Sequence, residues 1–172
     1  MNTSPKNKGG NKALGVAYYF VKKNEKDKKD LNNKKLQKLL YYAQAWNLVL
    51  NRQPLFSNKI EAWIHGPAIL EIWQAFKDFD FNIPHPEITE SLFDDLNKKE
   101  TKLLDEIWRI YGKYDGNYLE TLAHNELPWQ EARKGVSGLE PSQNEISLER
   151  MKEYYEQKLK SAMAKKIQKT KE

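Results

Sequence analysis

The stretch "KKLQKLLYYAQAWNLVL", residues 34–50, decides the fold class of this chain. Its apolar residues recur at i, i+3, i+4 and i+7, the spacing that gathers side chains on one face of an α-helix. The buried face is expected to consist of Leu36, Leu39, Leu40, Ala43, Trp46 and Leu50. The opposite face is expected to carry Lys34, Lys35, Lys38 and Tyr42. Asn32 or Asn33 is suited to cap the first turn, so the stretch predicts a long amphipathic helix.

Helical spacing also occurs on both sides of this stretch. It predicts helices at residues 12–23, 68–79, 87–97 and 98–114, a short helix followed by a second helix start within 115–135, and a long charged helix over 146–169. Residues 53–65 break the spacing with Pro54 and with alternating apolar and polar residues, which favours a short extended or hairpin segment. We therefore expect a mainly α, single compact domain of about six helices over residues 12–160. Residues 1–11 are expected to be a disordered lead-in and residues 161–172 a basic helix end or tail.

The composition excludes cysteine chemistry and argues against membrane association. The 172-residue chain has no cysteine, which excludes disulfides, thiolate zinc sites and cysteine nucleophiles and suits a reducing compartment. No apolar run approaches the ~18–20 residues that a membrane span requires, and the N-terminus lacks the apolar core of a signal peptide. We expect a soluble, cytoplasmic protein that does not associate with membranes.

The net charge of +5 is unevenly distributed. Residues 1–30, 31–60 and 150–172 each carry +5, whereas residues 61–149 hold eighteen acidic against eight basic residues, a net charge of −10. Such asymmetry either attracts a charged partner or is neutralised within the fold. The basic ends allow salt-sensitive nucleic-acid binding, but no nucleic-acid-binding module is visible and arginine is scarce. For the tail "KLKSAMAKKIQKTK", residues 158–171, we favour a solvated helix end.

Two segments place a histidine shortly before a proline: His65-Gly66-Pro67 and the run from His124 through Glu126 to Pro128 and Trp129. Proline suits the first turn of a helix, so we expect Pro67 to open a helix with His65 beside its N-terminus, and Pro128 to open another. Helix N-termini can receive a carboxylate or phosphate. The alternative is internal: the histidines are core residues and Glu126 caps its own helix.

Catalytic and metal sites find little support in these residues. His124 and Glu126 form an H-x-E, but a cysteine-free chain lacks the P-C-x-x-C partner of zinc deaminases, and H-E-x-x-H is absent. His65, His85, His124 and Glu126 show no paired metal-ligand spacing. Nucleophile elbows, glycine-rich phosphate loops and paired catalytic carboxylates are missing. We expect no catalytic residues, no metal and no cofactor.

Four ordered motifs resemble the Panacea domain, also called the SocA-like antitoxin domain. They are the run Leu36–Gln44, Pro54–Phe56, Glu61–Trp63 with Gly66-Pro67, and "LAHNELPWQEAR" at residues 122–133. In the last motif Ala123 stands where the family pattern has Thr, which removes a hydroxyl. The resemblance spans about residues 12–158. It implies a non-catalytic antitoxin, encoded beside a cognate protein toxin and neutralising it by direct contact.

The resemblance also suggests which residues bind the partner or hold the scaffold. They are Tyr42, Gln44, Trp63, His65, Gly66, Pro67, His124, Glu126, Pro128 and Trp129. Tyr42, off the apolar stripe, is expected to be exposed for contact. For the histidine and proline motifs we favour a scaffold role, with Glu126 accepting a hydrogen bond from His65 or from a backbone N–H.

Several alternatives stay open at this point. The chain can be an adaptor that presents the toxin to a protease, or an autoregulator that binds nucleic acid through its basic ends. A homodimer is also possible. The acidic middle section suggests that the toxin surface is basic.

Overall fold

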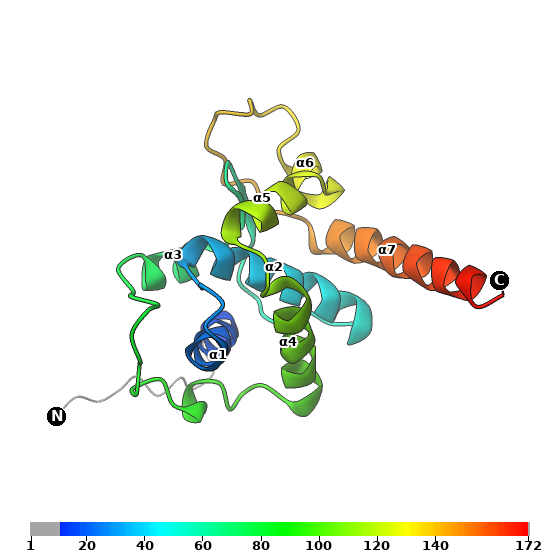
Figure 1. Ribbon diagram of the computed structural model, residues 1–172. Coiled ribbons are helices and arrows are strands. Elements are labelled where there is room, and N and C mark those ends of the chain that lie inside the picture. The colour runs from blue at the N-terminus through cyan, green and yellow to red at the C-terminus, as the bar shows by residue number, and fades with distance from the viewer. Residues whose placement is uncertain (1–10, 172) are drawn as a thin grey trace.

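Helices dominate the computed structural model, which describes residues 11–171 (Figure 1). Within that range the α-helices are α1 (Lys12–Asp27), α2 (Asn33–Leu50), α3 (Leu70–Phe76), α4 (Lys98–Tyr111), α5 (Gly116–His124), α6 (Leu127–Ala132) and α7 (Leu148–Lys169). The strands β1 (Glu61–Trp63) and β2 (Gly66–Ala68) and the 3₁₀ turn η1 (Glu90–Leu92) complete the elements. The predicted mainly α fold with one short extended segment is confirmed. The predicted disordered lead-in lies outside the described residues except for Asn11, which caps α1.

The helix α2 lies in the middle of the molecule (Figure 1) and contacts α1, α3, α4, α5, α7 and β2. Asn32, one of the two predicted caps, precedes its first turn and accepts a side-chain hydrogen bond from the backbone N–H of Lys35. Four residues of the predicted stripe are fully buried: Leu36, Leu39, Leu40 and Ala43. Its C-terminal end departs from the prediction, because Trp46 is only partly buried and Leu50 is 55% exposed.

Two lysines of α2 that were predicted to be exposed are buried. Because helices pack around α2 on several sides, Lys35 and Lys38 have no solvent to face, and they are 1% and 2% exposed. Their ammonium groups donate to main-chain oxygens instead, as buried polar groups must. Lys35 Nζ donates to the carbonyls of Lys29 and Gly112, and Lys38 Nζ donates to the carbonyl of Pro67 at 3.0 Å.

The extended segment is an antiparallel hairpin of β1 and β2. Trp63 pairs with Gly66, so the turn consists of two residues and Gly66 takes a φ of +95°, a conformation that glycine adopts without the cost other residues incur. The outer edge of β1 is covered in turn by the chain before α7. The N–H of Ala62 donates to the carbonyl of Asn144, and that of Ile146 to the carbonyl of Ile60, both at 2.8 Å.

The prediction that Pro67 opens a helix was wrong. Pro67 lies in β2 opposite Ala62, and the following helix α3 begins only at Leu70. A proline is tolerated at the edge of a sheet because its missing N–H removes no ladder bond there. His65 is consequently a turn residue of the hairpin. Pro128, by contrast, does lie in the first turn of α6, as predicted.

The helix predicted over 87–97 was also wrong, since only the turn η1 forms there. The main-chain hydrogen bonds within residues 87–97 join residues three apart, in separate turns. Examples are Leu92 N–H to Thr89 O and Leu96 N–H to Phe93 O. Ile88 and Leu96 are buried in the core, so tertiary packing holds this segment without a regular helix. The capping box of Asn97 and Glu100 then starts α4.

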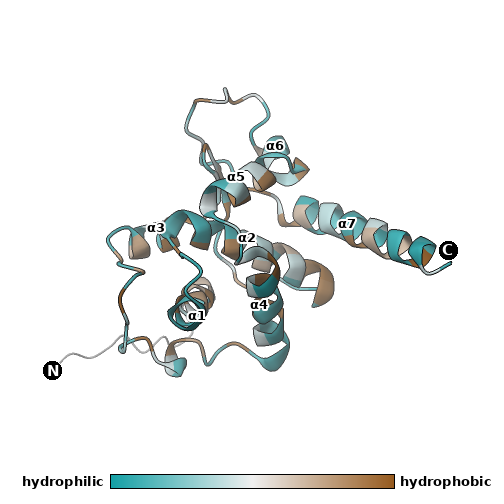
Figure 2. Ribbon diagram, viewed as in Figure 1, coloured by the Kyte–Doolittle hydropathy of each residue, from teal (hydrophilic) through white to brown (hydrophobic). Residues whose placement is uncertain are grey.

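The last helix, α7, projects beyond the rest of the domain (Figure 1). Ser147 caps it, and Met151 and Tyr155 are fully buried, whereas every residue from 160 to 171 is exposed. Figure 2 shows hydrophobic residues at the nearby end of α2 and along parts of α7. Among residues 11–171, no helix combines the length and the hydropathy needed to cross a membrane.

Candidate functional site

Glu126 is the centre of a buried polar cluster. The residue precedes α6, and the carboxylate is turned inward with 2% of the residue exposed. Its Oε2 accepts hydrogen bonds from Tyr41 Oη at 3.0 Å and Tyr155 Oη at 2.6 Å, and Lys158 Nζ lies 3.4 Å from Oε1. Burial raises the pKa of Glu126, against the opposing effect of the tyrosine hydrogen bonds and of Lys158. The cluster ties α2, α6 and α7 together.

The predictions for Glu126 as a helix cap or as an acceptor from His65 were wrong. Its side chain makes no capping hydrogen bond to α6. Both hydroxyls donate to Oε2 and Lys158 lies beside Oε1, so the carboxylate faces the core and not the helix end. The hydrogen-bond partners of Glu126 are tyrosines of α2 and α7.

Tyr42 is buried, contrary to the prediction that it is exposed for contact. Its ring stacks on Tyr111 of α4 with centroids 4.1 Å apart and an interplanar angle of 6°. Its hydroxyl is buried with no hydrogen-bond partner among residues 11–171, and burial raises its pKa. The helical spacing was read correctly, but α4 covers the face that the sequence left to solvent.

Gln44 also serves the scaffold. Its amide N–H donates to the carbonyl of Phe56 at 2.9 Å, and its Oε1 accepts from the N–H groups of Leu55 and Phe56 at 2.7 and 3.3 Å. Both ends of the amide are thus used inside the core, where Gln44 is fully buried. This side chain fastens the segment after α2 to the helix itself.

The second predicted motif joins α5 and α6 to the hairpin. His124 stacks on Trp129 with centroids 4.1 Å apart, and Trp129 Nε1 donates to the carbonyl of Trp63 at 2.9 Å. Arg133 of the same segment donates to the carbonyl of Ala62 at 2.9 Å. Burial lowers the pKa of His124, which favours the neutral imidazole. These residues hold the position of the hairpin.

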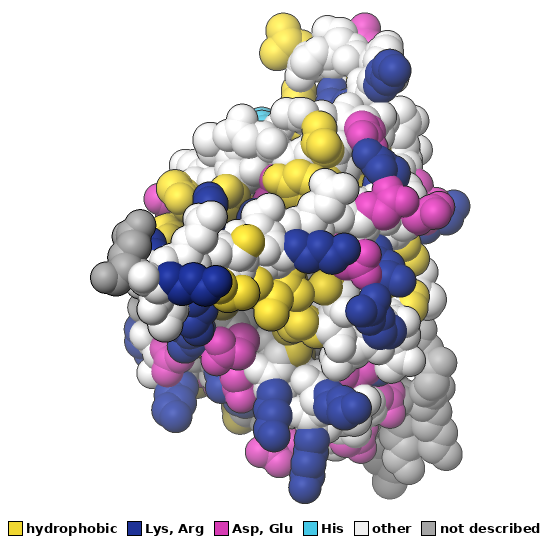
Figure 3. Space-filling model, turned by 90° about the vertical axis from the view of Figure 1, so that its right-hand side faces the viewer, with side chains coloured by type: hydrophobic (Ala, Val, Ile, Leu, Met, Phe, Trp, Pro, Cys, Tyr) yellow, Lys and Arg dark blue, Asp and Glu magenta, His cyan; other side chains and the backbone are white. Residues whose placement is uncertain are grey.

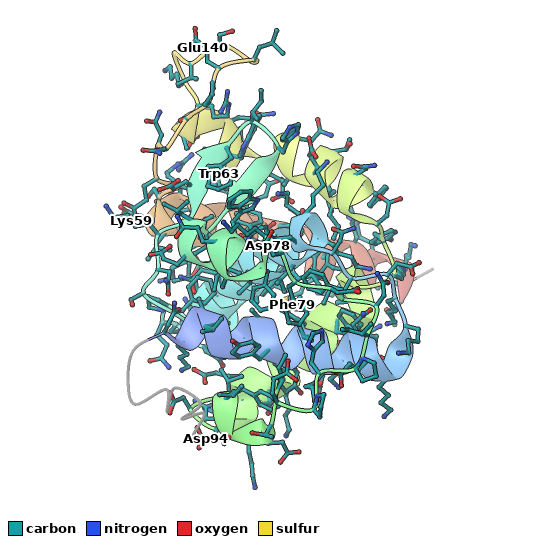
Figure 4. The ribbon with its side chains drawn as sticks, turned by 90° about the vertical axis from the view of Figure 1, so that its left-hand side faces the viewer. Lys59, Trp63, Asp78, Phe79, Asp94 and Glu140 are labelled. Atoms are coloured by element: carbon teal, nitrogen blue, oxygen red, sulfur yellow. The ribbon has the colours of Figure 1, made fainter. Side chains whose placement is uncertain are left out.

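A cavity of 320 Å³, here called the hairpin pocket, opens between α2, the hairpin and α3. It is lined by Lys34, Gln37, Lys38, Trp63, His65, Gly66, Ala68 and Trp73. Trp63 and Trp73 meet edge to face, with centroids 6.0 Å apart. Figure 4 views the face of the molecule that carries Trp63. The pocket therefore offers aromatic surface together with positive charge.

Charges around the hairpin pocket are only partly neutralised. Lys34 forms an ion pair with Glu120 of α5, and the exposed ring of His65 lies 3.1 Å from the other oxygen of that carboxylate. These contacts lower the pKa of Glu120 despite its partial burial. Lys38, in contrast, forms no ion pair with any residue between 11 and 171, and its Nζ uses one of three N–H donors, on Pro67. Burial lowers the pKa of Lys38 to about 7, with Glu120 opposing the shift.

The structure brings the predicted residues together in two groups. Glu126 and its tyrosines form the buried cluster, while Trp63, His65 and Gly66 line the hairpin pocket. Pro67 accepts a hydrogen bond from the pocket residue Lys38, and Trp129, which stacks on His124, donates to Trp63. Sequence reasoning missed Lys38 and Trp73 as pocket residues. Lys38 follows Lys34, Lys35 and Gln37 in the polar positions of its helical stretch, and Trp73 lies on another helix-forming stretch, so neither gave a signal of its own.

No metal site is assembled in the described part of the chain. Between residues 11 and 171, no three histidine, aspartate or glutamate side chains converge as metal ligands do. His85, the remaining histidine, stacks on Phe79 with centroids 4.0 Å apart and is held by Glu87 and the carbonyl of Asp80.

Comparison with known proteins identifies the family. The family model described as antitoxin SocA-like, Panacea domain matches residues 36–130, which include α2, the hairpin, Glu126 and Trp129. No curated protein and no solved structure matches the chain. Because the matched segment covers more than half of the 172 residues, the chain belongs to the antitoxin SocA-like, Panacea domain family.

Proposed function

We propose that this protein is an antitoxin that neutralises a cognate protein toxin by binding it directly, and that it acts without catalysis. Membership of the antitoxin SocA-like family supports the antitoxin role. The observation that carries direct binding is the hairpin pocket, which lies within the matched segment and holds two tryptophans beside a buried lysine. Tryptophan is a typical anchor of protein interfaces.

The chemistry of the hairpin pocket favours a toxin side chain that is apolar at its base and ends in a hydrogen-bond acceptor. The indole of Trp73, 42% exposed, provides a surface for the apolar part. The free donors of Lys38 Nζ are then available to the acceptor, since a buried ammonium gains from each hydrogen bond it makes. This contact does not require the buried Glu126 cluster, which keeps the frame rigid.

Co-expression with the product of the neighbouring reading frame tests the proposal. Wild-type protein is expected to co-purify with that product and to restore growth when the toxin is induced. Trp73→Ala removes the exposed indole of the pocket and is expected to weaken both effects. Ile110→Ala, which truncates a similarly exposed apolar residue on α4, is the matched control and is expected to leave both unchanged.

Titration separates binding from catalysis. Neutralisation by direct binding requires antitoxin in a fixed ratio to toxin, so purified antitoxin added in rising amounts should abolish toxicity only near that ratio. Inactivation of excess toxin by substoichiometric antitoxin would contradict the proposal. Toxin abundance in cells should also be unchanged by the antitoxin; a marked fall in abundance would indicate delivery to a protease instead.

A further inference from the structure

The apolar face of α7 continues past the end of the core. Residues spaced by four form one stripe on a helix, and here Met151 and Tyr155 are fully buried, followed by Leu159, Met163 and Ile167. Met163 and Ile167 are each 58% exposed. The stripe that packs inside the domain in the first half of α7 is thus presented to solvent in the second half.

The exposed stripe forms one wall of a groove. Leu50 at the end of α2, 55% exposed, lies on the opposite wall. A cavity of 490 Å³ between the two helices is lined by Val49, Leu50, Arg52, Glu156, Leu159, Lys160 and Met163. A neighbouring hollow of 300 Å³ is lined by Met163, Lys166, Ile167 and Thr170. We call this surface, defined by Leu50, Leu159, Met163 and Ile167, the α2–α7 groove.

Positive charge surrounds the α2–α7 groove. Residues 157–171 contain six lysines and no acidic residue. The one carboxylate that lines the groove belongs to Glu156, and it is already paired with Arg52 at 2.8 Å. Figure 3, which views the molecule from the side on which α7 ends, shows hydrophobic side chains lying between lysine and arginine side chains.

We propose that the α2–α7 groove is a docking surface for an acidic, amphipathic segment of the toxin. Apolar side chains of that segment enter the groove, and its carboxylates meet the lysines of α7. This inference rests on the proposed antitoxin function and adds a contact separate from the hairpin pocket.

The shape and charge of the groove favour this occupant over others. A second copy paired through the same face would bring six lysines of one α7 against six of the other, and like charges in contact are unfavourable. Nucleic acid neutralises lysines but does not need three exposed aliphatic side chains. A bilayer surface is flat and leaves a 490 Å³ concavity between two helices unfilled, whereas protein side chains fill such hollows.

The test measures the affinity for the co-purified toxin of wild-type protein and of two double variants. Met163→Ser with Ile167→Ser removes exposed apolar side chains, so the fold is retained, and is expected to raise the dissociation constant about tenfold or more. Ala164→Ser with Gln168→Ser changes exposed residues of the same helix that lie off the stripe and is the matched control, expected to bind like wild type. Circular dichroism verifies that both variants keep their helix content.

Charge is tested separately. Lys165→Glu with Lys166→Glu is expected to weaken toxin binding and to reduce its salt dependence between about 0.05 and 0.5 M NaCl. Equal affinities for wild type and for the apolar variant would overturn the inference while leaving the proposed function intact. Absence of toxin binding by wild type would overturn the proposed function itself.

Two further outcomes would assign the groove to another occupant and overturn the inference. One is a wild-type dimer, seen by sedimentation, that the apolar variant loses. The other is wild-type binding to vesicles with about 30% phosphatidylglycerol that the apolar variant loses while its toxin affinity is unchanged.

Discussion

Replacing Glu126 measures how much of the fold depends on the buried cluster. Glu126→Ala would leave the hydroxyls of Tyr41 and Tyr155, now 3.0 and 2.6 Å from Oε2, without an acceptor. Hydrogen bonds to a charged group contribute about 1.5–3 kcal/mol each, and an unpaired buried hydroxyl adds its own cost. Relief of the buried charge offsets part of this loss. We expect Glu126→Ala to lower the free energy of unfolding by about 3–5 kcal/mol.

Glu126→Gln separates the acceptor from the charge. Both tyrosines donate to the same oxygen of Glu126, so the carbonyl of a glutamine in that place can accept both hydrogen bonds. The glutamine therefore loses only the charge interaction with Lys158, which lies 3.4 Å away and is partly exposed. The expected cost is about 1 kcal/mol or less. Glu131→Gln, at an exposed ion pair with Arg150, is the control and should change stability by less than about 0.5 kcal/mol.

The pH dependence of stability, compared between wild type and Glu126→Gln, gives an independent check. Burial raises the pKa of Glu126, so the folded protein binds a proton at this site more readily than the unfolded chain does. The stability of wild type relative to Glu126→Gln should therefore increase as the pH falls from about 8 to 5. Urea denaturation followed by tryptophan fluorescence measures both quantities. A Glu126→Gln variant as unstable as Glu126→Ala would refute the reasoning, because charge and not acceptor geometry would then hold the cluster.

Three other substitutions test local features of the site. Gly66→Ala adds a Cβ 2.7 Å from Lys38 Cε at a φ of +95° and should lower the free energy of unfolding by about 1–3 kcal/mol. In the control Gly138→Ala the added Cβ meets nothing within 4 Å, so its stability should be unchanged. Equal melting temperatures of the two variants would contradict this prediction. Tyr42→Phe removes a buried hydroxyl without a partner in the described range, so unfolding by urea should show unchanged or higher stability, up to about 1 kcal/mol, and a clear loss would reveal an unrecognised hydrogen bond. Burial lowers the pKa of Lys38 to about 7, so above that pH the unfolded chain binds a proton that the folded protein does not. As the pH rises from 7 to 9, the stability of wild type relative to Lys38→Met should therefore increase by up to about 1.4 kcal/mol per pH unit. A difference that stays constant with pH would mean that the ammonium is solvated.

Much of the fold was predictable because its signals are local. Leucines and aromatics at helical spacing identified α2 and α4, and the break at residues 53–65 identified β1 but not β2. The failures arose where distant segments decide the outcome. Lys35 is buried because Lys29 and Gly112 offer carbonyls to its ammonium, and no spacing within α2 reveals how many neighbours a helix has.

The candidate site was harder to predict for the same reason. Glu126 was identified as important, but its partners lie 85 and 29 residues away, at Tyr41 and Tyr155. The pocket combines Lys38 of α2 with Trp73 of α3, and each residue alone reads as part of a helix. Local pattern finds the residues whose chemistry is unusual; only the packing of the helices tells which of them face a common space.

The two proposed contact surfaces differ in how freely their residues can be substituted. The buried cluster of Tyr41 and Glu126 and the hairpin lie within residues 36–130, the segment matched by the family model. The groove residues on α7 lie beyond it: Leu159 is partly buried against the core, whereas Met163 and Ile167 lie on an exposed helix end. Substitutions on an exposed helix end change stability little, so we expect Met163 and Ile167 to tolerate replacement while the cluster that holds α7 in place stays the same. The hairpin pocket has less of this freedom, because Gly66 is constrained by both its φ and the close approach of Lys38.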